Sequence, residues 1–258
     1  MSAWTEGALA PRPGAATTRR MLAAQTAAEL KLMLRNGEQV LLTLVIPLGL
    51  LVVLTLIPFV TVEGDSRVDF FVPGVIALAV MSTAFTGQAI AVGFERQYGV
   101  LKRLGATPLP RAVLLTAKTL AVLTVELVQL LLIAAVGLLF LHWRPVGDPL
   151  SVLLLVVLGT AAFSGLGLLL GGTLRGLTTL AAANLVWFVL LVLGGVLFPL
   201  SQLGGAEPVL ELLPAAALSD GLRTVLQDGA SVPPRDLLVL GAWAVGGLAL
   251  ASRLFRWE

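Results

Sequence analysis

The 258-residue sequence contains no cysteine, one histidine and one tyrosine, and only 12% of its residues are charged. Without cysteine, disulfide bonds, thiolate nucleophiles and cysteine-ligated metal sites are excluded. The single histidine, His142, precedes Trp143 at an expected membrane boundary. Aromatic residues commonly occupy such boundaries, so we assign His142 a structural role. We therefore predict no catalytic residue and no metal site in this chain.

The sequence also lacks a phosphate-binding loop of the pattern Gly-x-x-x-x-Gly-Lys-[Ser/Thr]. The chain therefore cannot hydrolyse ATP by that route, and we expect it to bind no cofactor of its own. No repeat of 20–50 residues and no second, soluble domain can be recognised. The net charge is only +2, which gives no reason to expect nucleic acid as a partner.

Hydrophobic residues make up 57% of the chain, against roughly 45–50% in soluble domains, which indicates that lipid is the main solvent. Four uncharged runs are at least 21 residues long, enough for a helix to cross a hydrocarbon core about 30 Å thick. Two weaker runs contain Glu126 and Arg253 respectively. The predicted membrane spans cover residues 40–60, 70–94, 119–141, 150–174, 177–203 and 237–254.

The positions of lysine and arginine predict the orientation of the chain. If the N-terminus lies inside the cell, 13 of these residues fall in inner segments and 4 in outer loops. Inner loops of membrane proteins carry the excess of positive charge, so we expect both termini in the cytoplasm. The predicted fold class is all-α: a polytopic membrane protein with six transmembrane helices.

Two different segments precede the first span. Residues 1–18 are rich in Ala, Pro and Gly and lack the apolar core of a signal peptide, which predicts a disordered cytoplasmic tail. Residues 19–39 place Leu22, Leu30, Met33 and Leu34 on one helical side, which predicts an amphipathic helix on the membrane surface. A solvated extension of the first span is the alternative.

A short basic segment, residues 95–111, separates the second and third spans. A helix through it would place Phe94, Tyr98 and Leu101 on one face. Pro108 would end that helix and Pro110 would begin the next. We interpret the segment as a rigid amphipathic element in the cytoplasm. A simple positively charged anchor is the alternative, but it would not require the Tyr, Leu and Pro pattern.

The longest outer loop, residues 204–236, contains the signals of two short helices, one over 208–214 and a second over Leu218, Leu222 and Val225, with Gly229 as the stop. We expect them to cover the outer mouth of the bundle. Small residues spaced by four in the fourth span predict close helix packing. These pairs are Gly167 with Gly171 and Gly172 with Gly176.

Glu126 is the one ionisable side chain deep within a predicted span, and a buried carboxylate is costly in lipid. It either contributes to a substrate pathway or is a buried acid that ties helices together by hydrogen bonds. Gln129 and Thr119 share its helical stripe. Further polar groups in other spans could line the same cavity; they are Ser82, Thr86 and Asn184.

Residues 95–111 resemble the ABC-2 type permeases, the membrane subunits of a class of ATP-binding-cassette exporters. The matching residues in this segment are Glu95-Arg96, Gly99, Leu101, Leu104 and Thr107-Pro108-Leu109. Further matches are Phe198-Pro199-Leu200, the element from Leu213-Pro214 to Gly221-Leu222-Arg223, and the ending Phe255-Arg256-Trp257-Glu258. The resemblance covers residues 19–258 and is strongest to the small drug-efflux branch, which includes the anthracycline-resistance permeases.

The resemblance implies a half-transporter. Two permease chains, identical or related, would associate with two copies of a separate ATPase subunit that binds ATP and Mg, in a prokaryotic-type cell membrane. The segment between spans two and three would be the coupling helix. Its implied contacts with the ATPase are Glu95, Arg96, Gly99, Leu101, Lys102, Arg103 and Leu104. The implied outer gate comprises Phe198, Pro199, Pro214 and Arg223.

The leading hypothesis is ATP-driven export of an amphiphilic small molecule, either a drug-like compound or a lipid. Export of a lipid-linked glycan is the nearest rival, but the spans contain few of the aromatic rings that often line a glycan channel. A membrane subunit that couples an ATPase to another process is a third hypothesis. An intramembrane enzyme would need a second catalytic group, and the helix of Glu126 offers none.

Overall fold

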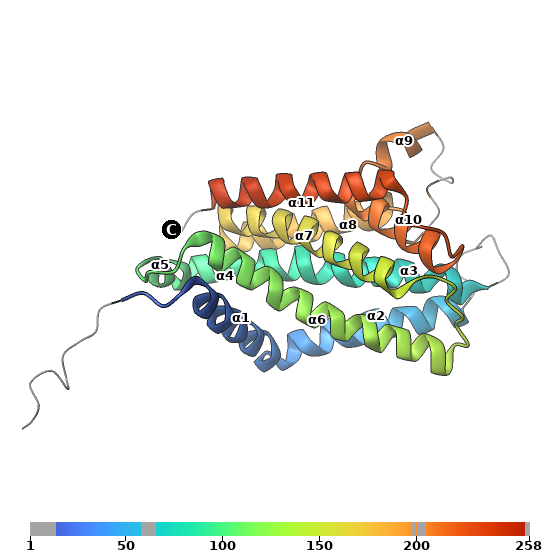
Figure 1. The fold of residues 1–258 in the computed structure, drawn as a ribbon, viewed down its shortest axis with the longest axis horizontal. Helices are drawn as coiled ribbons and strands as arrows, with labels where there is room; N and C mark the ends of the chain where they lie inside the picture. Colours follow the sequence, from blue (N-terminus) through green and yellow to red (C-terminus); the bar gives the residue numbers. More distant parts are fainter. Residues whose placement is uncertain (1–13, 58–65, 198–199, 201–204, 256–258) are drawn as a thin grey trace, which may run out of the picture.

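The computed structural model describes residues 14–57, 66–197, 200 and 205–255, and all structural statements below concern these residues. The chain forms helices throughout (Figure 1). Their bounds are α1 Thr18–Arg35, α2 Gly37–Leu56, α3 Arg67–Val80, the π-helix η1 Met81–Gly87, α4 Gln88–Gln97, α5 Val100–Gly105, α6 Arg111–Phe140, α7 Pro149–Thr173, α8 Gly176–Leu193, α9 Glu207–Leu210, α10 Pro214–Leu226 and α11 Pro234–Leu254.

The long helices lie side by side along one axis, and the short helices lie at its ends (Figure 1). Helices α1 and α5 and the end of α11 lie at one end, which we call the α5 end. Helices α9 and α10 lie at the other, the α10 end. This distribution agrees with the predicted division into inner and outer segments, and the all-α class is confirmed.

Five helical segments of the described chain are long and apolar enough to cross a membrane. They cover Arg67–Gln97, Arg111–Phe140, Pro149–Thr173, Gly176–Leu193 and Pro234–Leu254. The predicted first span, 40–60, corresponds to α2, whose apolar part is Thr43–Leu56. Residues 58–60 lie outside the described residues. The structure therefore supports a polytopic membrane protein.

Three predicted boundaries were wrong. The predicted surface helix ends at Arg35 instead of residue 39, because the backbone departs from helical geometry at Asn36. The third span begins at Arg111 instead of residue 119 and therefore contains Lys118. The fifth span ends at Leu193 instead of residue 203, because Gly194 and Gly195 follow and Gly195 has φ of 65°. Residues 1–13 of the predicted tail lie outside the described residues.

Close packing of α7 against η1 and α4 forms the centre of the bundle. A Cβ atom at Gly167 would lie 2.7 Å from the carbonyl oxygen of Phe85, and one at Gly171 would lie 2.5 Å from that of Ala89. Any larger side chain would push the helices apart. The predicted close packing at these glycines is therefore confirmed. It covers the second span, which is almost completely buried.

His142 ends α6 at the α10 end. Its φ of 57° is in the left-handed region, which turns the chain back so that the Trp143 amide donates a hydrogen bond to the Gly137 carbonyl at 2.9 Å. This geometry is a common C-terminal helix stop. The turn packs the Trp143 ring onto Gly137, and Trp143 is only 5% exposed. The arrangement supports the structural role assigned to His142.

Candidate functional site

The segment predicted as one continuous helix contains a break at Gly99. Helix α4 ends at Gln97, Gly99 has φ of 69°, and α5 covers only Val100–Gly105. The prediction of one unbroken helix up to Pro108 is therefore wrong, because a left-handed residue at Gly99 stops the α-helical ladder. Pro110 directly precedes α6, as predicted. The result is a short rigid turn of helix at the α5 end of the bundle.

The break separates the residues that were expected to share a face. Leu101 is fully buried in a cluster with Leu114 and Phe255, against which Leu104 also packs. Tyr98 is 65% exposed and stacks on Phe94. Leu101 therefore offers no exposed surface to a partner subunit in this structure. It holds α5 against the bundle.

The exposed side of this element carries Tyr98, Lys102 and Arg103. Arg96 points inward instead, and its guanidinium donates to the carbonyl oxygens of Gly172 and Leu174 at 3.1 and 3.3 Å. Those carbonyls lie at the C-terminal end of α7, where a cation is favourable. Arg96 thus joins the end of α4 to the end of α7.

Glu95 belongs to a buried ion triad. The Lys118 ammonium lies 2.7 Å from a Glu95 carboxylate oxygen and 2.9 Å from one of Glu29, and its side chain is 4% exposed. The triad joins α1, α4 and α6. Sequence analysis missed it because Glu29 was assigned to a surface helix and Lys118 to a loop. The unexpected length of α6 is what places Lys118 inside the bundle.

Three predicted pathway residues lie around one groove. Ser82, Thr86 and Asn184 line a cavity of about 340 Å³ between α2, η1 and α8. Trp187 also lines it and donates a hydrogen bond from its indole nitrogen to the Ser82 hydroxyl at 3.0 Å. The π-helix η1 supplies Ser82 and Thr86, and such irregular turns occur frequently at functional sites. The remaining lining residues are Thr43, Ile46, Pro47, Leu78, Thr83 and Gly87.

Glu126 does not lie in that groove. It is 2% exposed, accepts a hydrogen bond from the Thr160 hydroxyl of α7, and borders a separate void of about 10 Å³. Gln129 borders the same void and links the two regions. Its amide donates to the Thr43 carbonyl at 2.7 Å and accepts from the Thr83 hydroxyl at 3.2 Å. The hypothesis that Glu126 shares one cavity with Ser82, Thr86 and Asn184 is therefore corrected. Glu126 lies outside the groove and borders a separate void.

The α10 end is closed by the two predicted short helices, α9 and α10. Pro214 begins α10, and the Arg223 guanidinium donates to the carbonyl oxygens of Gly195 and Val196 at 2.6 and 3.0 Å. It also lies over the Phe70 ring, 4.2 Å from the centroid. Burial lowers the pKa of Arg223 to about 10, so the side chain stays protonated at neutral pH. Phe198 and Pro199 lie outside the described residues.

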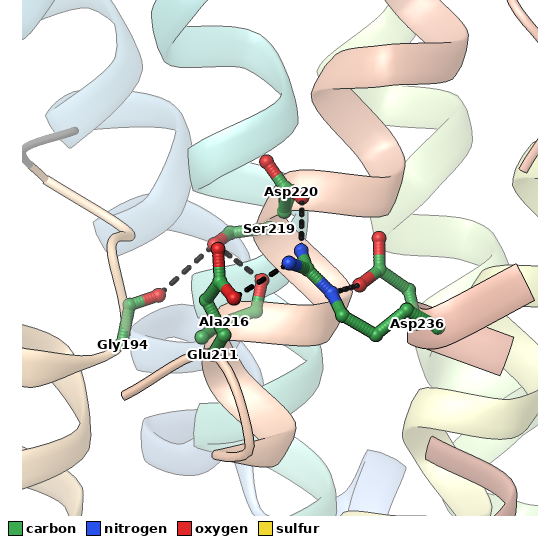
Figure 2. Close-up of polar contacts among 7 residues, drawn as sticks. Gly194, Glu211, Ala216, Ser219, Asp220 and Asp236 are labelled. Atoms are coloured by element: carbon green, nitrogen blue, oxygen red, sulfur yellow. Dashed lines mark hydrogen bonds and ion pairs between the residues drawn. The ribbon is translucent and has the colours of Figure 1, made fainter. Parts of the chain in front are cut away.

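A second arginine at this end, Arg235, was not singled out by sequence analysis. Its guanidinium lies 2.7 Å from Glu211, 2.9 Å from Asp220 and 3.2 Å from Asp236. Figure 2 shows the three carboxylates around it, next to Ser219, which hydrogen-bonds to the Gly194 carbonyl. The network connects the turn after α9 with α10 and α11. Sequence spacing gave no signal for it, because the acids come from three segments.

The arrangement of apolar helices, buried ion network and terminal short helices defines a multi-pass membrane protein whose polar groups lie within the bundle. A sequence model of the family described as ABC-2 type transporter matches residues 21–226. The chain belongs to this family and is a membrane component of an ABC transporter. Such components generally work with an ABC ATPase subunit. No individual curated protein matches the chain.

Proposed function

We propose that this chain is the permease half of an ATP-driven exporter that moves an amphiphilic small molecule, either a drug-like compound or a lipid, out of the cytoplasm or the inner leaflet. The observation that carries the proposal is the groove between α2, η1 and α8. Its volume of about 340 Å³ falls within the range of small-molecule sites. Its lining combines apolar side chains, such as Ile46, Leu78 and Trp187, with hydroxyl and amide groups, and such a mixed wall suits an amphiphile.

The same lining favours a small amphiphile over a lipid-linked glycan. Glycans present many hydroxyl groups and stack on aromatic rings, whereas Trp187 is the one aromatic residue that lines this groove within the described chain. Its indole nitrogen is already bonded to Ser82. A glycan would therefore find no further aromatic ring to stack on among the described residues of this groove.

The ATPase partner would bind at the α5 end. We propose that two copies of a separate subunit bind ATP and Mg and dock against the exposed side of α5, with Tyr98, Lys102 and Arg103 at the contact. Leu101 and Leu104 would transmit the movement, since they pack α5 onto the helical bundle. Glu95 and Arg96 bind to α6 and α7 respectively, so they connect the docking element to the membrane spans.

A second permease chain, identical or related, would complete the transporter in a prokaryotic-type cell membrane. Helices α2 and α8 flank the groove, and both expose large apolar side chains, including Ile46, Leu185 and Phe188 at 55%, 65% and 59%. Such surfaces require lipid or another apolar helix as a neighbour. A second chain placed here would convert the groove into an enclosed pathway.

The test is ATP-dependent uptake of a fluorescent amphiphile, rhodamine 6G, into inside-out vesicles that contain the permease and its ATPase. We expect uptake and stimulated ATP hydrolysis with the complex and neither with the permease alone. Ser82→Leu should reduce uptake by filling the groove. Ser252→Leu is the matched control, because Ser252 is exposed on α11 and bonds only within that helix among the described residues.

Uptake by the permease alone would overturn the proposal. A complex that forms and hydrolyses ATP but moves neither rhodamine 6G nor a fluorescent phospholipid would favour the non-transporting alternative. Equal uptake by the wild type and Ser82→Leu would show that this groove is not the pathway.

A further inference from the structure

We infer that the cavity between α1, α4 and α6 is a binding subsite for the primary ammonium group of an amphiphile. The cavity has a volume of about 120 Å³ and includes all three members of the ion triad in its lining. It is distinct from the groove that contains Ser82 and lies toward the α5 end. Three observations carry the inference: the charge of the triad, an unpaired amide, and a neighbouring apolar groove.

The ion triad carries one uncompensated negative charge. Two carboxylates, from Glu29 and Glu95, face one ammonium group, that of Lys118. The Glu29 carboxylate also accepts a hydrogen bond from the Gln25 amide at 2.7 Å. Both Glu95 oxygens lie within 2.8 Å of the Lys118 nitrogen, so the triad is bonded internally but carries one uncompensated negative charge. A cation in the cavity would balance this charge.

Gln88 supplies a polar group without a partner. Its residue is 5% exposed, and neither its amide nitrogen nor its amide oxygen has a hydrogen-bond partner among the residues that the structure describes. Buried polar groups of native proteins are nearly always bonded, because an unpaired group loses its hydration without compensation. Gln88 lines the same cavity as Glu95. A ligand that donates to its amide oxygen would satisfy this group.

The chemistry of the cavity selects an ammonium among small ligands. An anion would meet the surplus negative charge of the two carboxylates. A divalent metal prefers a shell of several oxygen ligands, and the Lys118 ammonium would lie within it. A primary ammonium matches the single surplus charge. It can donate to the Gln88 oxygen, which has no partner among the described residues, and share the Glu95 and Glu29 carboxylates with Lys118. The volume exceeds what one water molecule requires by several-fold.

An apolar groove lies beside this cavity. It has a volume of about 260 Å³, lies between α1, α2 and α6, and has an almost wholly aliphatic lining. Met33 lines both spaces, and methionine is a flexible side chain that can adapt its shape. An alkyl chain attached to the ammonium can therefore continue along the groove. In naming an amine-bearing amphiphile as cargo, the inference rests on the proposed export function.

The experiment measures binding to the full-length permease in phosphatidylcholine nanodiscs. The probes are radiolabelled dodecylamine and radiolabelled dodecanol, which share the alkyl chain and differ in charge. We expect saturable binding of dodecylamine and none of dodecanol above empty nanodiscs. Gln88→Leu and Glu95→Gln should each weaken dodecylamine binding about tenfold, because each removes a hydrogen bond to a charged group. Glu207→Gln, at the α10 end, is the control and should bind as the wild type.

Equal binding of the two probes, or unchanged affinity in both variants, would overturn the inference. Binding is compared only for variants whose melting temperature equals that of the wild type. Gln88→Leu is expected to fold, because an apolar side chain suits a buried position. Competition by phosphatidylethanolamine in the nanodisc would identify a lipid head group as the ammonium source, and its absence would identify a free amine. ATP-driven uptake of rhodamine 6G without this selectivity would leave the proposed function intact while the inference fails.

Discussion

Two buried ionisable side chains of this protein bind partners on other helices. Lys118 contacts carboxylates of α1 and α4, and Glu126 accepts a hydrogen bond from Thr160 of α7. A charge at membrane depth is tolerated when it is paired within the bundle. Each of these residues therefore determines how two or three helices are rotated against one another, in addition to any role in transport.

Replacement of Lys118 by methionine should destabilise the protein by about 3–5 kcal/mol, because it leaves two carboxylates buried without their cation. The measurement is the melting temperature of the purified chain in detergent. Lys31→Met is the control, since Lys31 is exposed on α1. Addition of Glu29→Gln and Glu95→Gln to Lys118→Met should restore much of the loss. A Lys118→Met protein as stable as the wild type would contradict a structural role for the triad.

Glu126→Gln should leave the melting temperature and assembly with the ATPase unchanged, because the amide oxygen can still accept the hydrogen bond from Thr160. Glu126→Ala should cost about 2–4 kcal/mol through a lost hydrogen bond and an enlarged void. We expect transport by Glu126→Gln to match the wild type, as the residue lies outside the groove. A selective fall in export of cations by a folded, assembled Glu126→Gln complex would instead place Glu126 on the substrate pathway.

At the level of elements, the α4–α5 break gives the proposed docking element, residues 98–105, two different sides. Gly99 adopts a left-handed conformation that costs other residues roughly 1 kcal/mol or more. The break allows Leu101 to enter the bundle while Tyr98 remains exposed. Movement of a subunit bound to the exposed side would thus pass into α6 and α11 through the Leu101 cluster.

Leu101→Asp should destabilise the permease itself, because the carboxylate would replace a fully buried side chain in the cluster with Leu114 and Phe255. We expect a loss of several kcal/mol, measured as a lower melting temperature before any ATPase is added. Tyr98→Ala is the contrasting variant: it should melt like the wild type but bind the ATPase more weakly. Normal stability of Leu101→Asp with lost ATPase binding would show that Leu101 faces the partner.

At the level of the whole molecule, the inner and outer segments occupy opposite ends of the bundle (Figure 1). The α10 end is held by arginines that bind main-chain carbonyls and carboxylates across segments. The α5 end carries the triad and the exposed residues of α5. The proposed exporter needs such a division, since its ATPase would bind at one end and cargo would leave at the other.

The orientation can be tested directly because the chain has no native cysteine. Single cysteines at Val209 in α9 and at Ala106 after α5 would be exposed at opposite ends. In intact cells, a membrane-impermeant maleimide should label Val209→Cys but not Ala106→Cys, and permeabilisation should expose both. The reverse pattern would contradict the orientation predicted from the lysine and arginine positions.

The sequence by itself determined the features that depend on local composition. The length of an uncharged run decides whether a helix can cross lipid, so the all-α class and most spans followed directly. The glycine spacing of α7 and the two outer helices were also predictable. These features depend on helical periodicity and on the thickness of the bilayer.

Only the tertiary structure decided which polar groups meet across helices. Glu29 and Lys118 are 89 positions apart, and their contact depends on how α1 and α6 are rotated about their axes. The same applies to Arg235 and its three acids, to the separation of Glu126 from the groove, and to the burial of Leu101. Helix rotation is set by the packing of whole surfaces and by small residues at close contacts. No single segment contains that information, so these contacts could not be predicted from the sequence alone.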